Sequence, residues 1–574
     1  MAPDTQHGLR AEAWSDGALR DAALGRIYTP DSLSTWVAEE LHKRLEGPSA
    51  IWDIACGDGA LLKAVHIIEP RHALSGVDID GPAVARAGLA LHDANLVVRD
   101  ALIPGEGETP STDLVAAVGG SRPSAMILNP PWGAQVNATP RSLRSLGYCT
   151  AVGQFDTYDL FVELSVELLR PGGIGAFILP DSLLNVEHLP LRRLLLARTT
   201  VEMIARLGEG FFPSVCRGVV VLVVRNERAA ASHQVACLRL SPSERRQVLQ
   251  GQVSLREIAA QTSHLVPQAW FSRNDQLRFE LDVHEGERVH LQRFEIADRL
   301  KWREQLVSSR GVEISKHGHV TRCPNCGSAT PTPRPPRAVA CGVCKSEYSS
   351  ADAEQEIVVR DLGEIREDDT WKPLIAGQDV RRYHAYPSRL LRLDVPGLAY
   401  KNPESFQGDK LLIRKTGVGL NAAVDRSGAL TTQVVYHYKR LPNTPVSFIL
   451  DYLAGILNSR FMLAYHLRTR GDSEWRSHPY ITQRVIEELP VPQVVIGTDR
   501  HVIARKLGEA ARSLGNGTAH DVRRELQVES LVAALYGFDS TDWRWALRVL
   551  DTAESLEGIR NVRLPTSTLL SDIA

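Results

Sequence analysis

The amino-acid sequence predicts a doubly wound α/β fold in the first half of the chain and a mixed α+β fold that contains a zinc ribbon in the second half. Three observations support this prediction. Before residue 130, short apolar runs that end in an acid alternate with helical patterns, as they do in βαβ units. Two close pairs of cysteines lie between residues 323 and 344. From Trp371 to Arg440 the sequence becomes strongly basic.

Length and composition exclude several classes of protein. A chain of 574 residues is too long for one core, so we expect several domains. Hydrophobic residues make up 43% and charged residues 23%, which is ordinary for globular proteins, and the net charge of −2 averages over any local basic region. No apolar stretch approaches the roughly 20 residues of a membrane span, and the first residues do not have the form of a signal peptide. We therefore expect a cytoplasmic protein with no membrane partner.

The first βα unit is predicted at residues 51–65, where an apolar strand leads through a glycine turn into a helix. The turn carries Cys56, Gly57 and Gly59, and glycines let the backbone approach a ligand closely. It has neither the Gly-x-Gly-x-x-Gly pattern nor a phosphate-binding Lys-Ser/Thr pair. A nucleoside without phosphates is therefore favoured over a dinucleotide or ATP.

Acids end three successive predicted strands: Asp53, Asp78 and Asp100. In a doubly wound sheet these strand ends meet at one edge, where a carboxylate can bind ribose hydroxyls. Any one of these acids alone would also suit a solvated strand end. Together they favour a ligand site.

The chemistry is predicted at Asn129-Pro130-Pro131-Trp132, which follows the buried apolar residues 125–128. The prolines remove two backbone donors, so carbonyl groups there can point into a cleft beside the Asn amide oxygen. These acceptors suit a planar amine, and the indole ring can stack on a flat base.

This order of motifs resembles the gamma class of S-adenosylmethionine-dependent DNA methyltransferases, which modify the exocyclic amine of adenine and are typified by restriction-modification enzymes. The resemblance implies a Rossmann-like methyltransferase domain followed by a target-recognition domain. It implies that Thr29 lies at the methionine carboxylate of the cofactor, and that Asp78 binds the ribose. Ile79 would pack on the cofactor's adenine, and Asp100 would accept a hydrogen bond from its amine. The wall under the methionine would be formed by Asp53, Cys56, Gly57 and Gly59.

The resemblance also assigns the catalytic residues. The amide oxygen of Asn129 and the carbonyl of Pro130 would accept both N–H bonds of the target amine, with Pro131 completing the turn. Trp132 would stack on a base rotated out of the duplex. Phe212, in the second aromatic motif, would pack against that base opposite Trp132.

The cysteine pairs predict a structural zinc site. Cys323 and Cys326 are separated from Cys341 and Cys344 by 14 residues, which suits four thiolates around one closed tetrahedral Zn²⁺.

The segment from Trp371 to Arg440 is basic. It contains twelve Lys and Arg residues and five Asp and Glu residues, which gives a net charge of +7. Six aromatic residues are interleaved with them, so we expect this segment to contact double-stranded DNA.

We therefore expect an adenine-specific DNA methyltransferase with S-adenosylmethionine and structural Zn²⁺, the modification arm of a restriction-modification or phage-defence system. The alternatives are methylation of the cytosine amine, an RNA guanine or a protein glutamine, and a catalytically silent DNA-binding specificity subunit. We expect that this chain alone does not cut DNA, because only about 24 residues precede the cofactor motifs, too few for a nuclease fold. A separate nuclease or defence subunit is then the expected partner. The expected segments are a flexible arm (1–24), a methyltransferase domain (25–228), a connecting region (229–290), a target-recognition domain (291–500, zinc ribbon 318–350) and a helical segment (501–574).

Overall fold

The computed structural model describes residues 29–569 apart from 213–216, 274–275, 284, 297, 316, 334–336, 365–369, 471–478, 518–520 and 554–555. The arm expected at residues 1–24 lies outside the described residues. The chain divides into two compact units, Met1–His284 and Glu285–Ala574. Within the described part of the chain, no helix has both the length and the apolar character needed to cross a membrane.

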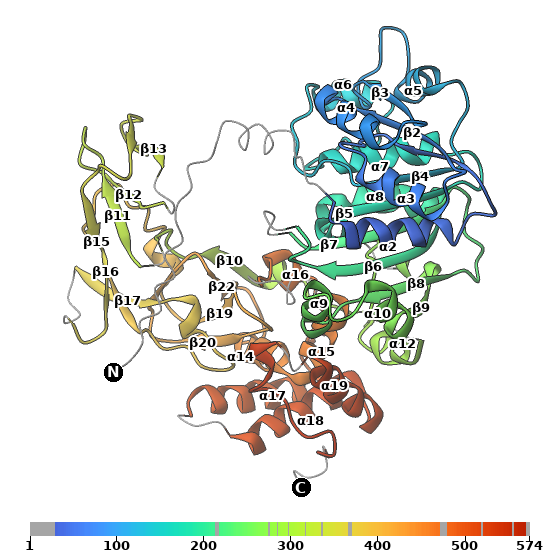
Figure 1. Cartoon of the computed structure of the whole chain (residues 1–574). Helices are drawn as coiled ribbons and strands as arrows, with labels where there is room; N and C mark the ends of the chain where they lie inside the picture. The colour runs from blue at the N-terminus through green and yellow to red at the C-terminus, as the bar shows by residue number, and fades with distance from the viewer. Residues whose placement is uncertain are drawn as a thin grey trace, which may run out of the picture. The chain divides into compact units, whose positions relative to one another are not determined.

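The first unit is built on a nine-stranded sheet with the order β3-β2-β1-β4-β5-β7-β6-β8-β9 (Figure 1). Its first five strands are parallel, and β7 runs antiparallel to both of its neighbours. These five strands are short and mostly apolar, which suits a parallel sheet that is covered on both faces. They are β1 (Ala50–Asp53), β2 (Ala73–Asp78), β3 (Asn95–Val98), β4 (Ala125–Leu128) and β5 (Ile174–Pro180).

Helices link the parallel strands: α3 (Ala60–Ile68), α4 (Gly81–Ala90), α5 (Pro110–Val118) and α7 (Thr157–Leu168). The strand order reverses between β1 and β4, because the chain adds β2 and β3 on one side of β1 and then β4 and β5 on the other. Right-handed crossovers consequently place α3 and α7 on opposite faces of the sheet. Such a reversal leaves a crevice at the carboxyl ends of the central strands.

The sheet continues past β6 (Thr200–Gly208) and β7 (Val219–Arg225) into the region expected to be a connection. There β8 (Gln234–Arg239) pairs with β6, and β9 (His264–Pro267) pairs with β8. Helix α10 (Leu255–Thr262) packs near α2 (Asp31–His42). The prediction of a connecting region at 229–290 is therefore wrong for most of its length, since these strands hydrogen-bond into the first unit. Its polar composition reflects two edge strands and exposed helices.

The second unit carries two four-stranded sheets. One has the order β10-β22-β19-β20 and contains β10 (Leu306–Arg310), β22 (Val435–Arg440), β19 (Lys410–Arg414) and β20 (Ala422–Asp425). The other has the order β16-β18-β17-β21 and contains β16 (Val359–Asp361), β18 (Arg389–Arg392), β17 (Trp371–Ile375) and β21 (Leu430–Thr431). Smaller sheets around the cysteines are formed by β11 (His319–Arg322), β12 (Ala329–Pro331) and β15 (Gln355–Ile357), and by β13 (Ala338–Ala340) and β14 (Glu347–Ser349).

Helices complete the second unit: α14 (Ile449–Asn458), α15 (Arg460–Thr469), α17 (Asp499–Gly515), α18 (Val522–Tyr536) and α19 (Ser540–Thr552). The Arg460 side chain on α15 is 1% exposed and pairs with Glu525 at 2.9 Å and with Glu529 at 3.2 Å, both on α18. A buried charge without its partner is strongly destabilising, so these pairs tie the last helices to α15. Residues 501–569 are therefore part of the second unit and not a separate segment.

Candidate functional site

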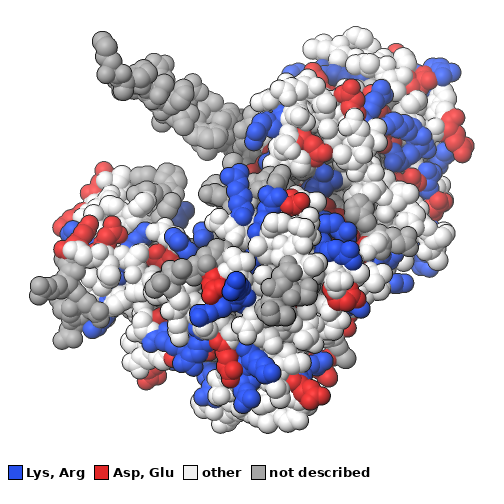
Figure 2. All heavy atoms as spheres, turned by 90° about the horizontal axis from the view of Figure 1, so that it is seen from below, with Lys and Arg blue, Asp and Glu red and all other residues white. Residues whose placement is uncertain are grey.

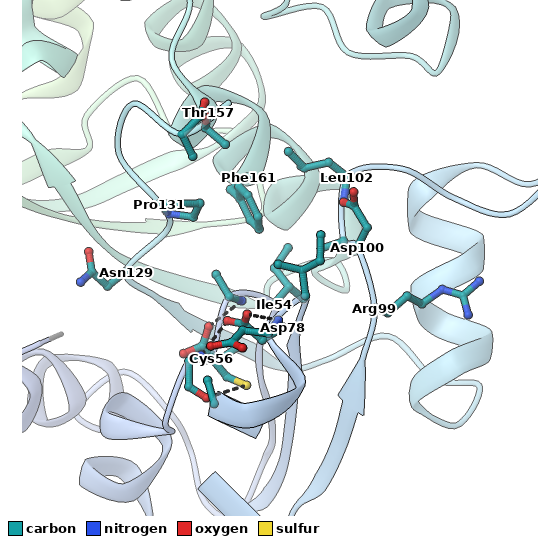
Figure 3. A pocket seen from close by; sticks show the side chains of 18 of the residues that line it. Ile54, Cys56, Asp78, Arg99, Asp100, Leu102, Asn129, Pro131, Thr157 and Phe161 are labelled. Atoms are coloured by element: carbon teal, nitrogen blue, oxygen red, sulfur yellow. Dashed lines mark hydrogen bonds between the residues drawn. The ribbon is translucent and has the colours of Figure 1, made fainter. Parts of the chain in front are cut away.

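A cavity of about 210 Å³ opens at the carboxyl ends of β1, β2, β3 and β4, where the strand order reverses (Figure 3). It collects residues that are far apart in sequence, because parallel strands end at the same edge. Gly59, Pro130, Trp132 and Phe212 do not line it. Nine predicted site residues do: Thr29, Asp53, Cys56, Gly57, Asp78, Ile79, Asp100, Asn129 and Pro131.

The glycine turn after β1 is held by the acid that ends β2. The backbone N–H of Gly57 donates to Oδ2 of Asp78 at 2.8 Å, and the N–H of Asp80 donates to Oδ1 at 2.9 Å. Gly57 has φ 53, a conformation that favours glycine. Gly59, at φ 82, turns the chain into α3, and a Cβ there would lie 3.1 Å from that of Ala87.

Two further acids on the cavity wall have different surroundings. Asp53 is 2% exposed and accepts a hydrogen bond from the N–H of Ala55 at 3.0 Å. Burial, aided by the charge of Asp78, raises the pKa of Asp53 to about 8. Asp100 uses Oδ1 to accept from the N–H of Leu102 at 2.9 Å, which shapes the turn after β3. Figure 3 shows Asp100 across the cavity from Asn129.

Two apolar features complete this wall. The side chain of Ile79 is 57% exposed and leaves an apolar surface on which a flat ring can pack. The thiol of Cys56 is 5% exposed, and burial raises its pKa, so it stays neutral. The wall therefore offers carboxyl groups at the strand ends and apolar surface between them.

Asn129 follows β4, whose four residues are fully buried, and its amide nitrogen donates to Oγ1 of Thr29 at 3.0 Å. Thr29 immediately precedes Pro30 and the first turn of α2. Because the amide nitrogen is held by this hydroxyl, the amide oxygen is turned the other way. The resemblance placed Thr29 at the methionine carboxylate; here its hydroxyl contacts Asn129, although the residue also lines the cavity.

The two aromatic residues predicted to flank a target base contact each other. Trp132 is 5% exposed and Phe212 is 3% exposed. Their ring centroids are 5.2 Å apart and their planes meet at 85°, an edge-to-face arrangement. In this conformation the rings fill the space that a base between them would need.

The start of α7 holds the loop that follows Trp132, a role that the sequence reasoning missed. Asp156 Oδ1 accepts from the N–H of Gly133 at 2.6 Å, and its Oδ2 pairs with Arg217 at 3.3 Å. Thr157 donates its hydroxyl to the carbonyl of Ala134 at 2.6 Å and lines the cavity. The available signal was the Asp-Thr pair before a helical run, which is typical of an N-cap.

The four cysteines of the second unit meet at one point. Their sulfur atoms all lie within 4.8 Å of one another. The Sγ–Sγ distance is 3.6 Å for Cys323 and Cys344, and also 3.6 Å for Cys326 and Cys341. Four thiolates bound at about 2.3 Å around one Zn²⁺ are separated by about 3.8 Å, so this donor set fits a tetrahedral structural zinc. The local core is small and consists mainly of Cys323, Cys341 and Tyr348.

Only part of the basic segment from Trp371 to Arg440 is available as the surface that its composition predicted. Tyr383, Phe406, Tyr436 and Tyr438 are each less than 5% exposed and belong to the core. Many of its cations are paired with acids, as Lys410 is with Asp425. Figure 2 shows one face of the molecule, on which Lys and Arg side chains alternate with Asp and Glu. Part of the positive charge of the segment is therefore neutralised within the fold.

Two family models match the chain. Residues 18–281 match the family described as N-6 DNA Methylase, and residues 372–491 match the TaqI-like C-terminal specificity domain. Neither range includes the four cysteines. The two matches confirm the resemblance that the motifs predicted.

Relatives and solved structures add similarities of smaller extent. A Type II methyltransferase of Thermus thermophilus is 29% identical over 213 residues, which cover 35% of this chain and 45% of that protein. This chain therefore matches less than half the length of that relative. The type IIG restriction endonuclease BpuSI is 15% identical with a TM-score of 0.40, covering 96% of this chain and 68% of that one. The DNA-bound Type ISP enzyme LlaBIII is 11% identical with a TM-score of 0.48, and the match covers 88% of this chain and 41% of that one.

Proposed function

Because the chain resembles the gamma-class adenine-N6 DNA methyltransferases in both its methylase region and its specificity region, we propose that it is a site-specific DNA methyltransferase. In this proposal it transfers a methyl group from S-adenosylmethionine to the exocyclic amine of adenine in double-stranded DNA. One observation carries the proposal: Asn129 and Pro131 line the same cavity as the strand-end acids Asp78 and Asp100. A target amine at the Asn would then lie beside a cofactor held by the acids.

The residues of the cavity fit S-adenosylmethionine. The Asp78 carboxylate would accept from the ribose hydroxyls, Ile79 would pack on the adenine ring, and Asp100 would accept from the adenine amine. Asp53, Cys56 and Gly57 would form the wall under the methionine. The bound cofactor would supply an electrophilic methyl group. Holding it in one position removes much of the entropic cost of the reaction.

Asn129 would activate the target. The lone pair of the adenine amine is delocalised into the ring, which makes the amine a poor nucleophile. Two hydrogen bonds, to the amide oxygen of Asn129 and to the carbonyl of Pro130, would draw the nitrogen toward tetrahedral geometry and aim its lone pair at the methyl group. Acceptors fixed before the reaction cost no reorganisation. The hydrogen bond from Asn129 to Thr29 supports this role, since it orients the amide.

The target base would leave the duplex to reach Asn129, at a cost of a few kcal/mol. Stacking on Trp132 would offset part of this cost, by roughly 1–3 kcal/mol. Because Trp132 contacts Phe212 edge to face, the base would have to separate the two rings. Phe212 would then contact the base from its other side.

The zinc would be structural. Cys323, Cys326, Cys341 and Cys344 would occupy all four positions of a tetrahedral ion, leaving none for a substrate. A module whose local core contains little more than two cysteines and a tyrosine needs such a ligand to fold. A separate nuclease or defence subunit would supply any restriction activity.

Modification-sensitive sequencing of DNA from a host that expresses the chain tests the proposal. N6-methyladenine at one recurring sequence, absent from a host expressing Asn129→Ala, is the expected result. N4-methylcytosine in its place would assign the cytosine amine as the substrate. If DNA is not methylated and calorimetry detects no binding of S-adenosylmethionine, the chain would be a DNA-binding specificity subunit and not a methyltransferase.

A further inference from the structure

Several buried or partly buried cations in the second unit have a carboxylate partner. The buried Lys410 ammonium pairs with Asp425, and Arg382 pairs with Glu525 at 2.9 Å. Arg426 pairs with Asp451 at 2.5 Å. Pairing is expected here, because a partly buried cation without an acid loses solvation and gains nothing in return.

Arg414, at the end of β19, has no such partner among the described residues. Its side chain is partly buried, and among the described residues its Nε has no hydrogen-bond partner. No acid lies within ion-pair distance in the part of the chain that the structure describes. The pKa of Arg414 is lowered by burial and by the positive charge of Arg381.

The fold places Arg381 beside Arg414. Side chains two apart on a strand share a face, so Arg414 lies on the face of Leu412, which belongs to the same buried apolar cluster as Val380. Arg381 is the next residue after Val380. The turn that it begins is held against β20 by the N–H of Tyr383, which donates to the carbonyl of Ala422 at 2.9 Å.

The loop after β19 is built around the guanidinium of Arg414. Gly417 has φ 104, and a Cβ at that position would lie 2.9 Å from Nη2 of Arg414. Neighbouring backbone fixes the loop: the N–H of Lys415 donates to the carbonyl of Val434 at 2.9 Å, and that of Gly417 donates to the carbonyl of Pro479 at 2.9 Å. The guanidinium therefore lies against the backbone of Gly417, whose positive φ favours glycine.

We propose that Arg414 and Arg381 form a binding site for a phosphate of the DNA backbone, with Gly417 providing its floor. This inference rests on the proposed function, because it takes DNA as the ligand. Two like charges with no acid between them among the described residues repel each other, and an anion relieves that repulsion. The edge of a base is neutral and would not relieve the repulsion between the two guanidinium groups. A guanidinium matches phosphate oxygens through two parallel N–H groups, which is the geometry that Arg offers.

The test compares variants by anisotropy with labelled duplex DNA at several salt concentrations. A lost phosphate contact lowers the slope of log affinity against log salt by about 0.9. Arg414→Gln and Arg381→Gln are each expected to show this loss, and Arg414→Lys is expected to keep most of the slope. The matched control is Arg440→Gln, which removes the same charge from an exposed residue of the same unit whose guanidinium donates to the Thr444 carbonyl.

Because a phosphate carries no sequence information, Arg414→Gln should weaken binding to target and non-target duplexes by the same factor. A loss confined to the target duplex would assign Arg414 to a base and overturn the proposal. An equal slope change in Arg440→Gln, or none in Arg414→Gln, would overturn it as well. At equal ionic strength, inorganic phosphate should displace DNA from the wild type better than chloride does, and this difference should be lost in Arg414→Gln, because a site for a backbone phosphate also binds the free ion.

Two readouts separate a phosphate site at Arg414 from a structural role of that residue and from the proposed methyl transfer. Thermal unfolding of Arg414→Gln is expected at or above the wild-type temperature, because the substitution removes a partly buried charge that has no ion-pair partner among the described residues. A fall of several degrees would indicate a structural role and overturn the inference. Slopes are measured without cofactor, so a chain that binds DNA through Arg414 but transfers no methyl group would disprove only the proposed function.

Discussion

The indole of Trp132 meets the phenyl ring of Phe212 edge to face, with the ring centroids 5.2 Å apart. The two residues are 80 positions apart in the sequence and approach along different strands, β4 and β6. An aromatic pair of this kind contributes about 0.5–1.5 kcal/mol beyond its buried area. A base that enters between the rings must replace that contact with stacking on both.

The first prediction concerns this pair. With 2-aminopurine at the target position, wild-type protein should raise its fluorescence on binding, because the base leaves the stack. Phe212→Ala should raise the KM for DNA roughly tenfold while leaving the affinity for S-adenosylmethionine unchanged. Phe212→Leu, which keeps an apolar side chain, should have a KM for DNA between those of the wild type and Phe212→Ala. An unchanged KM in Phe212→Ala would remove Phe212 from the base site.

Substitutions of Asn129 and Asp78 should affect different steps, methyl transfer in the first case and cofactor binding in the second. Asn129→Ala is expected to abolish methyl transfer with nearly unchanged cofactor affinity, because the Asn acts on the target. Asp78→Ala should weaken cofactor binding, since it removes the proposed ribose acceptor and the partner of the Gly57 N–H. Labelled methyl incorporation and calorimetry measure the two effects. Incorporation by Asn129→Ala within about tenfold of wild type would contradict the assignment.

Thr29 is predicted to position Asn129. Thr29→Val keeps the shape but removes the acceptor of the 3.0 Å hydrogen bond, so kcat should fall about tenfold with little change in KM for DNA. Thr29→Ser keeps a hydroxyl and should stay close to wild type. If Thr29→Val instead raised only the Kd for S-adenosylmethionine, the methionine carboxylate would be its partner, as the family resemblance implies.

Asp53 predicts a pH dependence of stability. Its pKa is about 8 in the folded chain against an ordinary value of 3.8, so the folded state binds the extra proton between these values. Its stabilising contribution is complete below pH 3.8 and is lost as pH rises through about 8. Asp53→Asn should therefore flatten the fall in Tm between about pH 5 and 8. Asp93→Asn, at an exposed carboxylate, is the control and should follow wild type.

The thiol cluster predicts one zinc per chain. Cys341→Ser should lose the metal and lower the unfolding temperature of the second unit, because the ribbon has little core of its own. S-adenosylmethionine binding should be unaffected, since the cofactor residues lie in the first unit. Mass spectrometry of protein purified without chelator measures the metal. Less than about half an equivalent would argue against a resident zinc.

Much of the first unit could be predicted from local patterns. The acids after β1, β2 and β3 were placed correctly at one cavity, because parallel strands that end in polar residues leave little choice of edge. The polar composition of residues 229–284 was misleading, since β8 and β9 are edge strands whose pairing depends on neighbours outside their own sequence. The same holds for Asp156, whose capping pattern was local but whose contacts with Gly133 and Arg217 were not.

The sequence by itself determined the order of the motifs, the strand-end acids and the spacing of the four cysteines, because each depends on residues that are close in the chain. Only the tertiary structure decided which groups are partners: Thr29 for Asn129 across 100 residues, and Phe212 for Trp132. It also decided that Lys410 is buried with Asp425 while Arg414 has no acid among the residues described around it. Charge counts cannot make that distinction, because whether a cation is neutralised depends on which side chains the fold packs around it.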